Sequence, residues 1–162
     1  MAKFTFNEQI QRGILYLFKS SDDFHIQIAP LIKSEYFEFP AHQNIYTIIK
    51  DYREKYQVLP TDSIIMEEAK NYKKDREYIS DYEDELHFID SIDVSSVSSP
   101  EYYLDLIEKF ARNQAMTIAI KESMILLQEG RIEAIENKVQ KALLINRNVD
   151  LGTDYYGDSY RS

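Results

Sequence analysis

Hydrophobic positions recur along this chain at the spacing of α-helices, with few breaks between them. In residues 7–19, Ile10, Ile14, Leu17 and Phe18 stand at i, i+4, i+7 and i+8, which places them on one helix face. Similar spacing predicts a short piece at 24–29 and longer helices over 41–56, 61–69, 75–93, 100–128 and 131–145. After residue 146 the periodicity fades. The predicted fold class is therefore all-α.

Local start and stop signals support these helices. Asn7, Thr61 and Ser99 stand where an N-cap side chain would accept from a free backbone N–H. Pro100 suits the first position of a helix, and Gly130 follows the longest one, where a left-handed residue often ends a helix. Two helices joined by a short turn at Gly130 form an antiparallel hairpin.

A serine-rich stretch divides the chain. We expect residues 1–93 to form a small globular helical bundle and residues 94–99 to be a linker. Residues 100–146 would then form the long helical hairpin, and residues 147–162 would begin a second linker.

The second half of the long helix is apolar on more than one face. One stripe consists of Ala115, Ile118, Ala119 and Ile125, and another of Met116, Ile120, Met124 and Leu127. The shorter return helix, with Ile132, Ile135, Val139, Ala142 and Leu143 on one face, can cover only one side. An uncovered apolar strip usually marks a protein contact. The alternative is that the hairpin packs back on residues 1–93.

Charge argues against a free-standing nucleic-acid-binding protein. The 162 residues have a formal net charge of −9, whereas phosphate neutralisation by basic side chains supplies most of the affinity for DNA. Residues 75–93 hold eight acidic residues and one basic residue, which predicts a helix with a solvated acidic face. The most basic patch is Lys70, Lys73, Lys74 and Arg76, and it would give at most weak, non-specific DNA contact.

Few residues suggest chemistry. Cysteine is absent, and no glycine-rich phosphate-binding motif occurs, so this chain is not a nucleotide hydrolase and we assign no catalytic, metal or cofactor residues. Glu83, Asp84 and His87 share a predicted helix face; a metal site is one interpretation, and a solvated face is favoured. His42 is expected to bond the loop before its helix. Without an export signal or a run of 18 apolar residues, the chain is expected to be soluble and cytoplasmic.

Several motifs occur in an order that resembles a known family. They are Glu8-x-x-x-x-Gly13-Ile14-Leu15, Phe24, Leu31, Tyr36-Phe37, Pro40-x-His42-x-x-Ile45-Tyr46-x-x-Ile49, Leu59-Pro60-Thr61, Phe110-Ala111-Arg112-x-Gln114-Ala115-Met116 and Ala142-Leu143. Together they resemble the N-terminal domain of DnaB-type replicative DNA helicases, over residues 6 to about 160.

Further motifs resemble the replicative helicases of T-even-like bacteriophages in particular. These are Ser34-Glu35-Tyr36-Phe37-Glu38, Tyr56-x-x-Leu59-Pro60 and Gly152-x-Asp154-Tyr155-Tyr156-x-Asp158-x-Tyr160. The strongly acidic segment 75–93 and the short return helix depart from the family pattern.

The resemblance implies a non-catalytic collar domain of a hexameric ring. Such collars assemble subunits and help to contact the primase in the primosome. ATP, Mg²⁺ and single-stranded DNA would bind only to a C-terminal RecA-like motor, which this chain lacks, so we expect the chain to continue beyond Ser162. A phage protein of this kind acts in the cytoplasm of the bacterial host, without a membrane.

The expected interface residues follow from the apolar stripes and this resemblance together. They are Phe110, Ala115, Met116, Ile120, Met124 and Leu127 for subunit or primase contacts, and Tyr155, Tyr156 and Tyr160 for docking of the linker. The three tyrosines could equally belong to a disordered end. The alternative function is a stand-alone protein of phage or host, a loader or inhibitor, that binds a helicase with the same fold.

Overall fold

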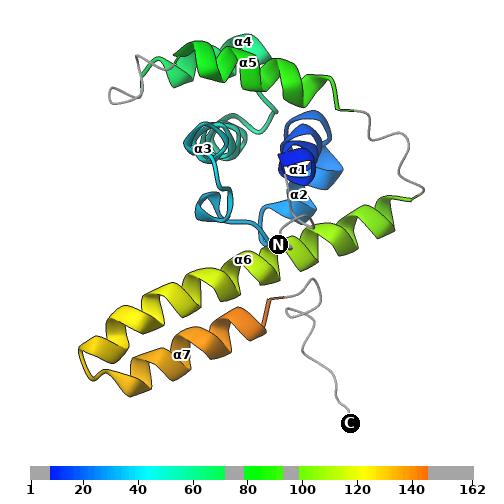
Figure 1. The fold of residues 1–162 in the computed structure, drawn as a ribbon. Helices are drawn as coiled ribbons and strands as arrows, with labels where there is room; N and C mark the ends of the chain where they lie inside the picture. The colour runs from blue at the N-terminus through cyan, green and yellow to red at the C-terminus, as the bar shows by residue number, and fades with distance from the viewer. Residues whose placement is uncertain (1–7, 72–78, 93–98, 146–162) are drawn as a thin grey trace. The chain divides into compact units, whose positions relative to one another are not determined.

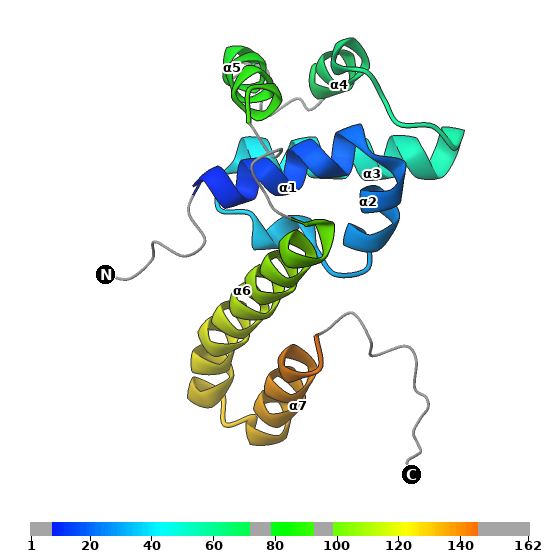
Figure 2. The same cartoon turned by 90° about the vertical axis from the view of Figure 1, so that its right-hand side faces the viewer.

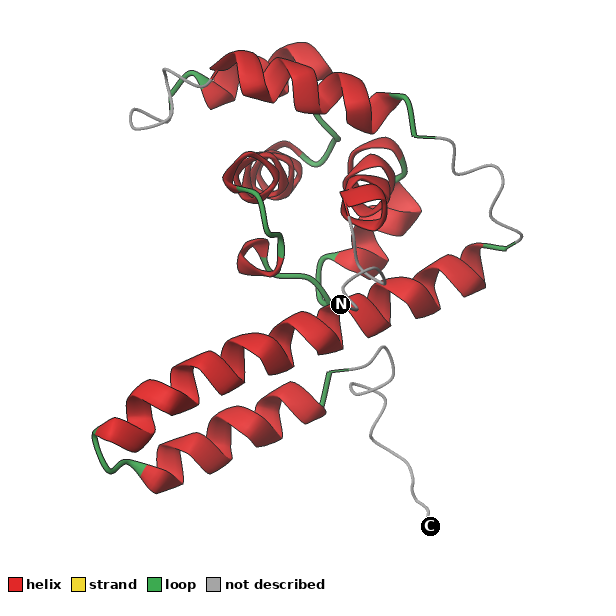
Figure 3. Cartoon of the chain, viewed as in Figure 1, coloured by secondary structure: helices red, strands yellow, loops and turns green. Residues whose placement is uncertain are grey.

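The structure is a computed structural model that describes residues 8–71, 79–92 and 99–145. Those residues form helices, turns and loops and no strand (Figure 3), so the predicted all-α class is confirmed. The chain divides into two compact units, residues 1–98 and 99–162.

The first unit holds five α-helices and one short 3₁₀ helix among its described residues. They are α1 (Glu8–Ser20), α2 (Asp22–Ile28), the 3₁₀ helix η2 (Ser34–Tyr36), α3 (Pro40–Tyr56), α4 (Asp62–Ala69) and α5 (Ile79–Asp90). The second unit holds α6 (Pro100–Gln128) and α7 (Ile132–Leu143).

Short-range signals set most helix ends. The hydroxyls of Thr61 and Ser99 accept from the backbone N–H groups three residues on, at 3.3 and 3.1 Å, as the sequence predicts. Gly130 has a φ of 76° in the turn after α6, the left-handed conformation expected of it. Asn7, the other predicted N-cap, lies outside the described residues.

Two local features differ from the sequence prediction. Helix α2 begins at Asp22 rather than 24, because the Ser21 hydroxyl caps it by accepting from the Phe24 N–H at 3.2 Å. The 3₁₀ helix η2 was not predicted, because a single turn of three residues is too short to show a hydrophobic period.

An aromatic cluster forms the centre of the first unit. The rings of Phe18 and Tyr46 stack with centroids 4.3 Å apart, and Phe37 lies 5.3 Å from Tyr46. All three side chains are fully buried. The Tyr46 hydroxyl donates to the Ile32 carbonyl oxygen at 2.7 Å, which joins α3 to the turn that precedes η2.

Helices α4 and α5 lie side by side and cross α1 and α3 at a steep angle (Figures 1 and 2). The apolar side chains of Tyr82, Leu86 and Ile89 are buried on α5. Polar joints add to this packing, because Glu85 contacts both Arg12 and His42.

The contact of His42 corrects one expectation. Its Nε2 lies 2.7 Å from Glu85 Oε1 on α5, so the imidazole bonds a distant helix and not the loop before its own helix. Glu85 was assigned to a solvated acidic face, yet its side chain is only 18% exposed. The half-buried cation of Arg12 and the buried imidazole of His42 explain why this carboxylate turns inward.

We predict that Tyr46→Phe lowers the free energy of unfolding by about 1 kcal/mol, because it removes one buried hydrogen bond and leaves the Ile32 carbonyl without that donor. Urea unfolding followed by circular dichroism measures this change. Tyr56→Phe is the control, since Tyr56 is exposed, and it should leave the midpoint unchanged. Equal midpoints for all three proteins would contradict the assigned role of the hydroxyl.

Candidate functional site

Helices α6 and α7 of the second unit run antiparallel and side by side (Figures 1 and 2). Lys138 Nζ lies 2.8 Å from Glu122 Oε1 and links the middle of α7 to the last third of α6. Nearer the open end, Arg112 donates from Nη2 and Nε to the Ile145 carbonyl oxygen at 2.9 and 3.2 Å. These contacts hold α7 along the second half of α6.

The seam between the two helices is narrow. Ala119 and Leu126 are buried on α6, and Ala142 is buried on α7. Ala119 and Leu126 are seven positions apart and therefore lie on one face. The sequence assigned Ile125 to the stripe of Ala119, but Ile125 is exposed. Leu126 takes the inner place, because two full turns from Ala119 end at residue 126.

The other predicted stripe forms an exposed apolar surface. Ile120, Met124 and Leu127 are 53%, 64% and 60% exposed, and intervals of four and three positions keep them on one face of α6. Met116, four positions before Ile120, is partly exposed at the edge of that face. We call this set, with the α7 residues described next, the hairpin face.

Helix α7 extends the hairpin face. Ile132 and Leu143 are both more than half exposed, and Val139 is partly exposed. In antiparallel right-handed helices joined through Ala119, Leu126 and Ala142, these side chains lie on the same side of the hairpin as Ile120 and Leu127. The Glu122–Lys138 ion pair lies on the opposite side. The sequence placed Ile132 and Leu143 on one face of this helix together with Ala142; in the structure Ala142 is buried, whereas Ile132 and Leu143 are exposed.

The remaining predicted interface residues are placed differently. Phe110 is fully buried and Ala115 is partly exposed, so neither belongs to the exposed surface formed by Ile120, Met124 and Leu127. Tyr155, Tyr156 and Tyr160, expected to dock the linker, lie outside the described residues. So do Lys73, Lys74 and Arg76 of the basic patch.

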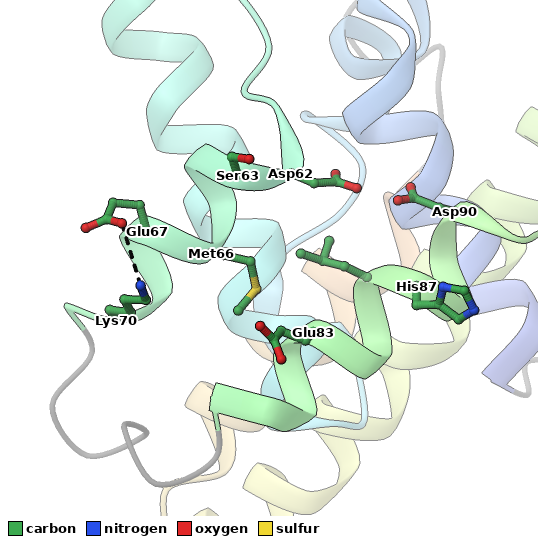
Figure 4. Close-up of a pocket in the computed structure, with 9 residues that line it drawn as sticks. Asp62, Ser63, Met66, Glu67, Lys70, Glu83, His87 and Asp90 are labelled. Atoms are coloured by element: carbon green, nitrogen blue, oxygen red, sulfur yellow. Dashed lines mark ion pairs between the residues drawn. The ribbon is translucent and has the colours of Figure 1, made fainter.

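A groove lies in the first unit, between α4 and α5. This groove has a cavity volume of about 550 Å³ and is lined by Asp62, Ser63, Met66, Glu67, Lys70, Glu83, Leu86, His87 and Asp90. Figure 4 shows Met66 and Glu83 facing each other across it, and the 3.8 Å ion pair of Lys70 with Glu67 at one end. Acidic side chains outnumber basic ones around its rim.

Lys19 of α1 neutralises part of that charge. Its Nζ lies 2.8 Å from Asp62 Oδ1 and 2.6 Å from Asp90 Oδ1, and its own side chain is 11% exposed. Burial opposes the charge of Lys19, but the hydrogen bonds to the two carboxylates outweigh it and raise the pKa of the ammonium group. Burial, with the neighbouring Asp62, raises the pKa of Asp90. Lys19 therefore holds two carboxylates together that would otherwise repel each other.

Among the residues that the structure describes, no group of three or more histidine, aspartate and glutamate side chains is arranged to hold a metal ion. Glu83, Asp84 and His87 are all exposed on α5. Within the same described ranges, no helix combines the length and apolar character needed to cross a membrane.

We predict that Lys19→Met destabilises the chain by about 1–2 kcal/mol at neutral pH, less than a fully buried ion pair would, because Asp62 and Asp90 remain about 40% exposed. The loss should shrink toward pH 4. Without Lys19 the pKa values of the two carboxylates rise in the folded state, so protonation relieves their repulsion.

Chemical unfolding at several pH values measures this dependence. Lys33→Met is the control, since Lys33 is exposed and should show no such pH dependence. A loss that is equal at pH 7 and pH 4 would contradict the role given to Lys19.

The chain was compared with protein-family models and with curated proteins. No protein-family model matches the chain, and no curated protein matches it.

Proposed function

We propose that this chain is the collar domain of a hexameric replicative helicase of the DnaB type, and that it assembles subunits and recruits primase. The observation that supports the proposal is the hairpin face, which presents Ile120, Met124 and Leu127 of α6 beside Ile132 and Leu143 of α7. The motif order given in the sequence analysis supplies the family.

The lengths of the two helices explain why the hairpin face needs a partner. Helix α6 has 29 residues and α7 has 12, so the return helix shields one side of about half of α6. Apolar residues at helical spacing on both helices suit packing against further helices, as ridges fit into grooves. A second copy of the chain offers such a surface, and a symmetric dimer would bury the hairpin faces of both copies against each other.

The charge of the chain also favours a role in protein contacts. The formal net charge of −9 suits a domain that binds protein and leaves DNA and ATP to a separate motor. In this proposal the chain alone hydrolyses no ATP. It would instead hold the six subunits of the ring together and provide a binding surface for the primase.

We predict that the double variant Ile120→Glu/Met124→Glu shifts self-association toward monomer by at least tenfold in the dissociation constant, because two buried charges without partners would enter the interface. Sedimentation velocity over a concentration series measures the mass. The monomer fold should persist, since both side chains are exposed in one copy.

The matched control is Lys121→Gln/Lys109→Gln, which changes the net charge by the same amount at exposed positions of α6. This variant should associate like the unchanged protein. If the glutamate variant keeps the same mass at every concentration, the hairpin face is not the self-association surface.

The coding sequence beyond residue 162 tests the family assignment. We predict a continuing reading frame that encodes a Gly-x-x-x-x-Gly-Lys phosphate loop, because a collar without a motor cannot drive unwinding. The primase from the same genome should then bind the chain in an equilibrium titration. A stop codon at this point would favour the stand-alone helicase-binding protein instead.

A further inference from the structure

Glu85 joins three helices of the first unit in one polar contact. It accepts from Arg12 Nη2 at 2.9 Å and from Arg12 Nε at 3.0 Å. Its Oε1 lies 2.7 Å from Nε2 of His42 on α3. The guanidinium of Arg12 also lies over the ring of Phe88, with 4.8 Å to the centroid. Removing α5 would therefore take away the hydrogen-bond partner of His42.

The imidazole of His42 is badly placed to accept a second proton. Its side chain is 0% exposed, and the rings of Phe37 and Phe39 lie edge-on at 6.3 and 5.1 Å. Because Nε2 faces a carboxylate, Nε2 carries the proton in the neutral ring and donates it to Glu85. The buried Nδ1 has no hydrogen-bond partner. A second proton would create a charged N–H there without an acceptor, which is costly in a buried site.

The charged groups around His42 come from two neighbouring helices. Burial lowers the pKa of His42, and the hydrogen bond to Glu85 on α5 opposes that effect. On α1, Arg12 lowers the pKa further and Glu8 raises it, although the Glu8 side chain is 54% exposed. The net direction is downward from the ordinary histidine value of 6.5. The docked state of α5 thus binds fewer protons than a state in which His42 meets water.

The aromatic centre of the first unit is built without α5. The stacked rings of Phe18 and Tyr46, with Phe37, come from α1, α3 and the turn after η2, and α5 contributes none of them. At the other end of α5, the pKa of Asp90 is raised and that of its neighbour Asp62 is lowered, so protonation of these two carboxylates has opposing effects on the folded state. Protonation of Glu85 also favours release: burial opposes its charge, but the hydrogen bonds from Arg12 and His42 outweigh burial and lower the pKa of this carboxyl. Between pH 7.5 and 5.5 Glu85 stays ionised, so His42 is the group of this contact whose protonation favours release of α5 in that range.

We propose that the contact of His42, Glu85 and Arg12 makes α5 a proton-sensitive latch. Helix α5 separates from α1 and α3 when His42 takes up one proton. The stabilisation that neutral His42 gives to the docked state of α5 is complete above the ordinary pKa of histidine, and it declines as the pH falls below that value. For one proton, the opening equilibrium rises up to about tenfold per pH unit in that range. The latch does not depend on the helicase assignment or on the hairpin face.

Hydrogen exchange of the whole chain between pH 7.5 and 5.5, corrected for the intrinsic exchange rate, tests the latch. Protection of the α5 amides should fall up to about tenfold between pH 6.5 and 5.5, and protection of the central α3 amides should fall less. His42→Gln keeps a side-chain N–H near Glu85 but does not titrate, so this fall should disappear. His87→Gln is the control, because His87 is exposed on the same helix, and it should behave like the unchanged protein.

Two results would overturn the proposal. One is an unchanged pH dependence of α5 protection in His42→Gln, and the other is an equal loss of protection in α3 and α5, which would mean global unfolding. If His42→Gln fails to fold, an NMR titration of the imidazole in the unchanged protein decides the question. A His42 pKa below 6.5 supports the latch, and a value at or above 6.5 overturns it.

Discussion

A single neighbouring helix can shield only one side of a helix, and this constraint governs the second unit. Helix α6 is more than twice as long as α7, and the seam between them buries Ala119, Leu126 and Ala142. Two of these three side chains are alanines, so the seam covers little of the apolar surface. Ile120, Met124 and Leu127 remain outside it. The space between the two helices is therefore filled, while the hairpin face stays exposed.

The first unit solves its packing problem differently. Its centre is a stack of aromatic rings that bury large surfaces with few rotatable bonds. The fifth helix is then attached by an apolar ridge and by two polar joints, Glu85 with Arg12 and His42, and Asp90 with Lys19 and Asp62. Apolar packing depends little on pH, whereas the polar joints respond to protons. The acidic segment thus combines a solvated surface with carboxylates that hold the bundle together.

The sequence predicted helix ends correctly where the interactions that set them span only a few residues. The caps at Thr61 and Ser99, the start at Pro100 and the turn at Gly130 occur as predicted, since each involves atoms within one helical turn. Periodicity also identified Ile120, Met124 and Leu127 as one stripe. Periodicity could not distinguish Ile125 from Leu126 as the inner residue, because apolar side chains lie on several faces of α6. Which of them is buried depends on where α7 packs.

Long-range partners lay beyond the reach of pattern analysis. Sequence order places His42 and Glu85 43 residues apart, and nothing in the spacing of either residue points to the other. The helical class, the helix ends and the excess of apolar surface on α6 follow from composition and short-range chemistry. The choice of which acidic residues turn inward, and which apolar residues stay outside, depends on how helices distant in sequence cross. That crossing is a property of the packed chain, because a carboxylate is buried only where another element brings it a cation or a donor.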